Sequence, residues 1–124
     1  MLPLTIEHQE KYALISVGAE KLNSLNAPDL KSNFVMLNND GVRNIILDLK
    51  QVQYSDSSGI SALLVGNRLC CDAGGTFVIT AINDSVQKVM KIAQIDRVLN
   101  ITPSVNEAID LVFMDELERS LDAE

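Results

Sequence analysis

Apolar and polar residues change their spacing several times along the chain, and these changes predict strands that alternate with helices. Residues 5–10 and 12–17 are typical of two strands joined by a polar turn, so we expect them to pair as a hairpin. Residues 43–49 and 76–81 are short apolar runs, which is typical of strands covered on both faces. Residues 98–101 are predicted to form a last short strand.

Four helices are predicted from apolar residues at helical spacing. Each is expected to begin at a polar residue whose side chain can accept hydrogen bonds from free backbone N–H groups. The expected caps are Asn26, Ser58, Asn83 and Ser104, and the last forms a capping box with Glu107. The final helix is the longest.

Strands that alternate with helices favour a parallel sheet with right-handed crossovers. We therefore expect an α/β fold, a single domain over residues 1–124. It should hold a mostly parallel mixed sheet of about five strands, with an antiparallel edge strand, and about four helices. A chain of 124 residues is long enough to bury one core. Only the acidic C-terminal tail, about residues 115–124, is expected to fray.

The final helix carries an apolar residue every four positions, at Ile109, Phe113, Leu117 and Leu121. Two interpretations stay open. The helix packs along the sheet and frays after Leu117, or the apolar strip extends beyond the core and supports a homodimer.

Charge and composition narrow the class of protein. The net charge of −7, with 10 Lys and Arg residues, argues against direct binding to nucleic acid, which requires a basic surface. No apolar run reaches the roughly 18 to 20 residues that span a bilayer, and the N-terminus lacks a signal-peptide pattern. We expect a cytoplasmic protein without membrane contact. Cys70 and Cys71 are adjacent and are expected to be reduced, with Cys70 in the core.

The most informative stretch is residues 54–60, Tyr-Ser-Asp-Ser-Ser-Gly-Ile, at a predicted junction between strand and helix. A helix start has unpaired N–H groups and a partial positive charge, so it favours a capping oxygen and can also hold a phosphate. If Ser58 is the cap, its hydroxyl is engaged and Ser57 is left free and facing solvent. The simpler interpretation is an N-cap without further function.

No catalytic arrangement is recognised. His8 is the single histidine and is expected on the surface, and Asp48 is expected to be a structural hydrogen-bonding group. The chain has no Gly-Lys-Ser/Thr phosphate loop, no Gly-x-Gly-x-x-Gly and no metal-ligand spacing. We expect no enzymatic activity, no cofactor and no metal. A small enzyme with an unrecognised site is the least favoured interpretation.

Three motifs together resemble the STAS domain family, and within it the bacterial anti-sigma factor antagonists. They are residues 22–30 after a strand that ends in Gly18, residues 46–60, and residues 74–77 before the next strand. The resemblance covers nearly all of the chain. In that family the first serine of the Asp-Ser-Ser-Gly turn is phosphorylated by a partner kinase, so the resemblance implies Ser57 as the acceptor.

The resemblance also implies partners. The unphosphorylated protein would bind an anti-sigma factor serine kinase and free the sigma factor. The phosphorylated form would dissociate, and a PP2C-type phosphatase would restore it. Transcription would then be regulated without contact with DNA. The alternative within the same fold is a non-phosphorylated scaffold or accessory domain of a transporter or signalling assembly.

The expected partner surface combines the first loop, the serine turn and the exposed side of the following helix. Its residues are Asn23, Ser24, Asn26, Asp56, Ser57, Ser58, Gly59, Ser61, Asn67 and Arg68. Family members commonly carry Asp where this chain has Asn23, within a segment one residue longer than usual. The amide keeps the shape of the side chain and loses its charge.

Overall fold

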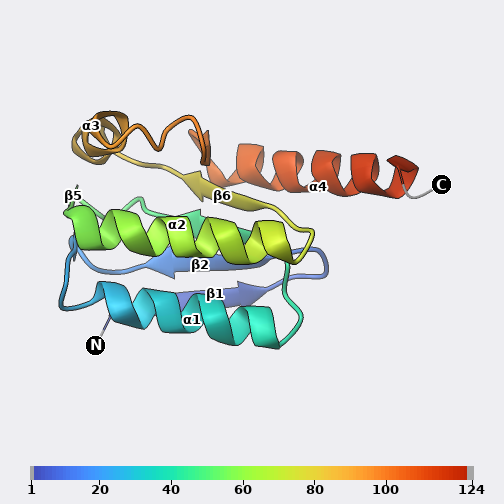
Figure 1. The fold of residues 1–124 in the computed structure, drawn as a ribbon, viewed down its shortest axis with the longest axis horizontal. Coiled ribbons are helices and arrows are strands. Elements are labelled where there is room, and N and C mark those ends of the chain that lie inside the picture. Colours follow the sequence, from blue (N-terminus) through green and yellow to red (C-terminus); the bar gives the residue numbers. More distant parts are fainter. Residues whose placement is uncertain (1, 123–124) are drawn as a thin grey trace.

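A computed structural model describes residues 2–122, in which strands and helices alternate (Figure 1). The strands are β1 (Leu4–His8), β2 (Ala13–Val17), β3 (Lys21–Leu22), β4 (Ile45–Asp48), β5 (Tyr54–Ser55), β6 (Phe77–Thr80) and β7 (Asn100–Thr102). The helices are α1 (Ala27–Asn39), α2 (Ser57–Asp72), α3 (Asp84–Ile92) and α4 (Val105–Asp122).

The main sheet has the order β1-β2-β4-β6-β7. Strands β1 and β2 are antiparallel, and every other neighbouring pair in this sheet is parallel. The predicted fold class, hairpin and antiparallel edge strand are confirmed. Most strand boundaries differ from the prediction by one or two residues; for example, β1 ends at His8 and the last strand begins at Asn100. A second sheet, formed by β3 and β5, was not predicted.

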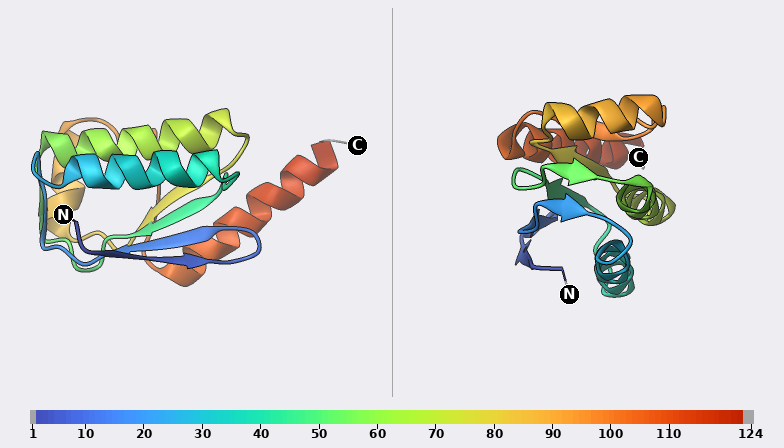
Figure 2. Two further views of the ribbon diagram at one scale, coloured as in Figure 1. Left: turned by 90° about the horizontal axis from the view of Figure 1, so that it is seen from below. Right: turned by 90° about the vertical axis from the view of Figure 1, so that its left-hand side faces the viewer.

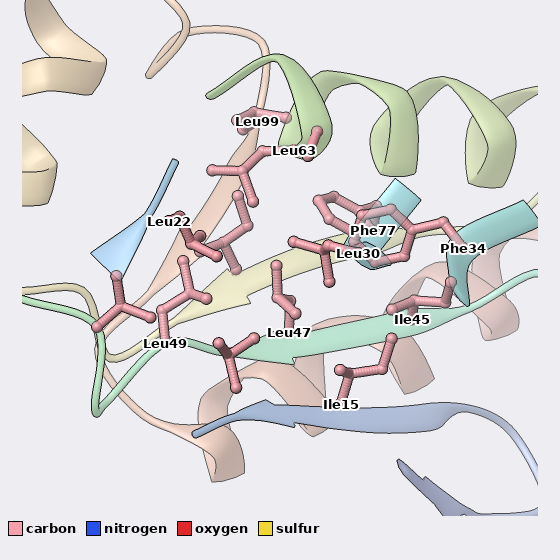
Figure 3. Packing of buried hydrophobic residues seen from close by; sticks show 14 of the residues in the cluster. Ile15, Leu22, Leu30, Phe34, Ile45, Leu47, Leu49, Leu63, Phe77 and Leu99 are labelled. Carbon is pink, nitrogen blue, oxygen red and sulfur yellow. The ribbon is translucent and has the colours of Figure 1, made fainter. Parts of the chain in front are cut away.

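Helices α1 and α2 lie side by side over one face of the sheet, and α4 lies on the other face (Figures 1 and 2). The larger core fills the space beneath α1 and α2, where the rings of Phe34 and Phe77 meet edge to face with centroids 5.5 Å apart (Figure 3). On the opposite face Ile46 and Val78 pack against Val112 of α4. Both faces of the central strands are therefore buried, as the apolar runs predicted.

Polar side chains attach α4 to the amino ends of β4 and β6. Arg43 and Glu116 form an ion pair at 2.6 Å, and Asn44 donates to the same carboxylate. The Thr76 hydroxyl donates to Asp115 at 2.9 Å, and the Thr76 N–H donates to the Asn44 side chain at 2.8 Å. Arg119 donates to the Thr76 hydroxyl at 3.1 Å. We call Arg43, Asn44, Thr76, Asp115, Glu116 and Arg119 the α4 anchor.

Beyond the anchor, α4 extends past the edge of the sheet (Figure 2). Its side chains at Phe113, Leu117 and Leu121 are 46%, 57% and 61% exposed. The helix continues through Asp122, and the last residues of the acidic tail, 123–124, lie outside the described part of the chain. Ile109 packs against the core and Phe113 meets the Tyr12 ring edge to face, so the strip is uncovered chiefly at Leu117 and Leu121. The homodimer stays a prediction.

Smaller expectations from the sequence are also resolved. Cys70 is buried and Cys71 is exposed, and both thiols are free. Burial, with a smaller contribution from Cys71, raises the pKa of the Cys70 thiol to about 12. His8 is exposed, and the Asp48 carboxylate accepts the N–H of Lys50 at 2.9 Å, which confirms its structural role. Within residues 2–122, no helix is both long and apolar enough to cross a membrane.

Candidate functional site

The short strands β3 and β5 bring the first loop and the serine turn together. Leu22 of β3 lies opposite Ser55 of β5 in a parallel pair, and the Leu22 carbonyl accepts the N–H of Asp56 at 3.0 Å. The Leu22 side chain points into the core beside Leu49 and Leu63 (Figure 3). The loop of residues 22–26 is therefore fixed at the amino-terminal end of α2.

Two asparagines shape this loop. Asn23 accepts the N–H of Leu25 at 3.0 Å, while Asn26 accepts the N–H of Asn23 at 2.9 Å and donates to the Lys21 carbonyl at 2.7 Å. Asn26 occupies the cap position of α1, but the expected amide cap is wrong, because its side chain makes no capping hydrogen bond. Its backbone is helical (φ −118°, ψ −15°), so the amide is directed toward the loop.

The predicted cap of α2 is also corrected. The cap is Asp56, whose carboxylate accepts the N–H groups of Ser58 at 2.8 Å and Gly59 at 3.2 Å. Pairing of β5 with β3 holds Asp56 in an extended conformation, from which a carboxylate reaches the first turn of the helix. Ser58 lies inside the helix, and the helix begins at Ser57.

Ser57 is exposed at this helix start, as expected although for a different reason. Within residues 2–122 no hydrogen bond engages its hydroxyl, since Asp56 satisfies the nearby N–H groups. Ser58 is half-buried. Of the two serines in the turn, Ser57 is the more accessible to another protein.

Gly59 lies beneath the turn and contributes no surface. It is buried, and a Cβ added there would lie 2.8 Å from the Leu22 Cβ and would overlap the Ser55 hydroxyl. The absence of a side chain lets α2 approach β3 and β5 closely. Gly59 was predicted to contact a partner, and the structure places it as a packing residue under that surface.

Two neighbouring hollows gather most of the remaining predicted residues. The first, which we call the serine hollow, has a volume of about 340 Å³ and is lined by Ser24, Ala27, Pro28, Lys31, Ser57, Ser58 and Ser61. The second, of about 410 Å³, is lined by Ser61, Leu64, Val65, Asn67, Arg68 and Val98. Ser61 lines both, so the two hollows form one continuous surface from the first loop to α2.

Six residues that line the two hollows were not predicted, namely Ala27, Pro28, Lys31, Leu64, Val65 and Val98. Leu25 at the loop tip is 87% exposed, Val98 is 59% exposed and Leu64 is 36% exposed. Leu25 belongs to the expected first loop, whereas Leu64 and Val98 lie in a predicted helix and a predicted strand, where apolar residues are usually buried. Lys31 lines the serine hollow from α1, and nothing in its local sequence points to Ser57.

The two hollows combine polar, apolar and cationic groups. Their side chains are hydroxyls, one amide, apolar groups and two cations, Lys31 and Arg68. Elsewhere in residues 2–122, no group of three or more His, Cys, Asp or Glu side chains is arranged to hold a metal ion.

Comparisons with known proteins agree with this arrangement. A family model described as the STAS domain matches residues 4–108. A protein of Thermotoga neapolitana, provisionally named an anti-sigma factor antagonist, is 28% identical over 74 residues, or 60% of this chain. The match spans 66% of that relative, just under two thirds of its length.

Two solved structures share the fold. One, provisionally named an anti-sigma factor antagonist, comes from Thermotoga maritima and superimposes with a TM-score of 0.78 at 24% identity, covering 88% of this chain and 93% of that one. The other is the Bacillus cell fate determinant SpoIIAA in its phosphorylated form, with a TM-score of 0.69 at 19% identity, covering 89% and 99%.

Proposed function

The chain belongs to the STAS domain family, and from this premise we propose that it is an anti-sigma factor antagonist switched by phosphorylation of Ser57. The observation that carries the proposal is the Ser57 hydroxyl, which is exposed at the start of α2 and forms no hydrogen bond within residues 2–122. It lies beside a hollow lined by hydroxyl groups and one lysine. The similarity to proteins with this provisional name supports it.

The switch follows from charge. A kinase transfers the γ-phosphoryl group of ATP to the Ser57 oxygen, and ADP and the hydroxyl proton are released. The product carries about −1.5 to −2 charges next to the Asp56 carboxylate. The partial positive charge of the α2 N-terminus stabilises the phosphate by about 1 kcal/mol, so the fold is retained. A partner packed on the turn is repelled by the negative charge that remains.

The expected loss of binding free energy is large enough for regulation. An electrostatic and steric penalty of about 3 to 4 kcal/mol at the interface weakens partner binding by a hundredfold or more. The unphosphorylated protein binds an anti-sigma factor that is also a serine kinase, which frees the sigma factor. Phosphorylation reverses this binding. A PP2C-type phosphatase then hydrolyses the phosphoserine to serine and inorganic phosphate.

The partner surface combines the two hollows with the neighbouring first loop and serine turn. Ser24, Ser57, Ser58 and Ser61 offer hydrogen-bonding groups, and Asn67 and Arg68 extend these along α2. Asn23, Asn26 and Asp56 support the loop and turn, and Leu25, Leu64 and Val98 add apolar contact area. The protein acts by binding in the cytoplasm, without a catalytic site of its own and without contact with nucleic acid.

The acceptor serine is identified by incubating the protein with ATP and a serine kinase encoded beside its gene, followed by mass spectrometry. We expect a single phosphate on Ser57. Ser57→Ala should abolish labelling, and the matched variant Ser58→Ala should retain it. Ser57→Asp should fold normally and lose affinity for the kinase.

Labelling on Ser58 alone, or no labelling by any such kinase, contradicts the proposal. Kinase binding that is retained without labelling would instead support the scaffold or accessory-domain alternative. If Ser57→Asp is unfolded by circular dichroism, the turn is chiefly structural.

A further inference from the structure

Lys31 is the only charged residue among the seven that line the serine hollow. Three serines and Ser57 itself supply hydroxyl groups, and Ala27 and Pro28 complete the wall. A lining that combines one lysine with four serines suits a phosphate, which accepts hydrogen bonds through three oxygens and carries negative charge. A carboxylate is absent from this lining.

Lys31 reaches the hollow from a different helix than Ser57. It lies one turn beyond Ala27 on α1, while Ser57 is the first residue of α2, and these helices begin at the same end of the molecule (Figure 1). Lys31 is half-buried, and within residues 2–122 it forms no ion pair. Its ammonium is therefore available to a new anion.

Other charged groups near Lys31 are engaged elsewhere or do not line the serine hollow. Asp40 lines a separate hollow along α1 together with Lys31 and is absent from the lining of the serine hollow. The Asp56 carboxylate accepts two backbone N–H groups, and the Asp29 carboxylate accepts the N–H of Leu2 at 2.8 Å. Arg68 lines the second hollow and not the first.

We propose that Lys31, with the hydroxyls of Ser24 and Ser61, binds in cis the phosphate carried by Ser57 and seats it in the serine hollow between α1 and α2. This inference rests on the proposed phosphorylation. The seated phosphate occupies the hollow, so a partner group that enters it in the unphosphorylated state is excluded. Lys31 is thus a positioning residue for the modified serine.

The test installs phosphoserine at position 57 during translation, so that no kinase is needed. The second pKa of the phosphate is then measured by ³¹P NMR titration. A neighbouring ammonium favours the dianion and lowers this pKa. Lys31→Gln should raise it by about half a unit, as expected for a partly exposed ion pair.

Two matched variants control this measurement. Lys31→Arg keeps the positive charge and should keep the lowered pKa. Lys11→Gln removes an exposed lysine from the β1–β2 turn at the far end of the molecule and should leave the phosphate pKa unchanged. Ser24→Ala combined with Ser61→Ala should raise it by a smaller amount than Lys31→Gln.

An identical phosphate pKa in the parent protein and in Lys31→Gln overturns the inference, provided that their circular dichroism spectra agree. That result leaves the proposed function intact, because the kinase experiment is separate. Conversely, a kinase that fails to label Ser57 contradicts the proposed function while this titration still reports on Lys31.

Discussion

At the scale of single residues, the start of α2 depends on Asp56 and Gly59, which have different tasks. Asp56 satisfies N–H groups that would otherwise be unpaired, and this leaves the Ser57 hydroxyl free. Gly59 allows the helix to lie against Leu22 and Ser55. The exposure of the proposed acceptor is therefore produced by its neighbours.

Replacing the cap should cost stability without altering the fold. Asp56→Ala is expected to lower the free energy of unfolding by about 1 kcal/mol, the usual effect of losing an N-cap side chain. Urea unfolding followed by circular dichroism measures this. Ser57→Ala, at an exposed position without hydrogen bonds, should change it by less than about 0.5 kcal/mol. Equal losses in the two variants would contradict the assignment of Asp56 as the cap.

Gly59→Ala tests the close packing beneath the turn. In an open helix, replacing glycine with alanine stabilises by up to about 1 kcal/mol. Here the added Cβ meets the Leu22 Cβ at 2.8 Å, so we expect a destabilisation of about 1 to 3 kcal/mol by the same urea assay. Ser61→Ala on the exposed side of α2 is the matched control and should be close to neutral. A stabilised Gly59→Ala protein would show that α2 can move away from β3.

At the scale of elements, a short strand pair positions the first loop and a small group of polar side chains positions the last helix. The two-residue strands β3 and β5 fix the first loop beside the turn, and the α4 anchor attaches the last helix to the sheet. Burial acts to raise the pKa of Glu116, but hydrogen bonds from Asn44 and Arg43 and the charges of Arg43 and Arg119 outweigh it, so this pKa lies below its usual value of 4.5.

The depressed pKa makes the anchor sensitive to acid. A carboxyl group whose pKa is lower in the folded state stabilises the fold above its unfolded pKa, and this stability is lost as the pH falls through the folded value. The difference in unfolding free energy between the parent and Glu116→Gln should therefore shrink as the pH is lowered from neutrality to below 4.5. The urea concentrations at which the two proteins are half unfolded, compared across this pH range, measure this difference.

Arg43→Gln provides the matched background for this experiment. Without the Arg43 partner, Glu116→Gln should have a smaller pH-dependent effect. A difference that stays constant across the pH range would show that Glu116 does not titrate differently in the folded state.

At the scale of the whole molecule, a partly exposed apolar strip on α4 coexists with a net charge of −7. Burial of Phe113, Leu117 and Leu121 in a homodimer would be favourable, whereas mutual repulsion of the acidic chains opposes it. Salt screens this repulsion. Sedimentation should therefore show a mass that rises with protein concentration, and more strongly at high salt.

The double variant Leu117→Glu, Leu121→Glu should remain monomeric under the same conditions. Both positions are more than half exposed, so the fold should tolerate these changes. A purely monomeric parent protein at high concentration and high salt removes the homodimer hypothesis.

The main architecture followed from local sequence patterns. The buried runs around Leu47 and Ile79 and the helical spacing of Leu30, Phe34 and Leu37 identified strands and helices, because burial of one face requires such spacing. The exposed Ser57 was also anticipated, although from an incorrect cap at Ser58. Three consecutive residues could each have capped α2, and local sequence does not choose among them.

The choice of Asp56 and the position of Lys31 required tertiary contacts. Asp56 becomes the cap because β5 pairs with β3, two segments separated by the whole of α1 and β4. Lys31 reaches the serine hollow because α1 packs beside α2. The sequence by itself determined the main helices and strands and most of their buried residues, because periodicity is a local property. Only the tertiary structure decided which polar groups meet at the turn, because those contacts join residues that are distant along the chain.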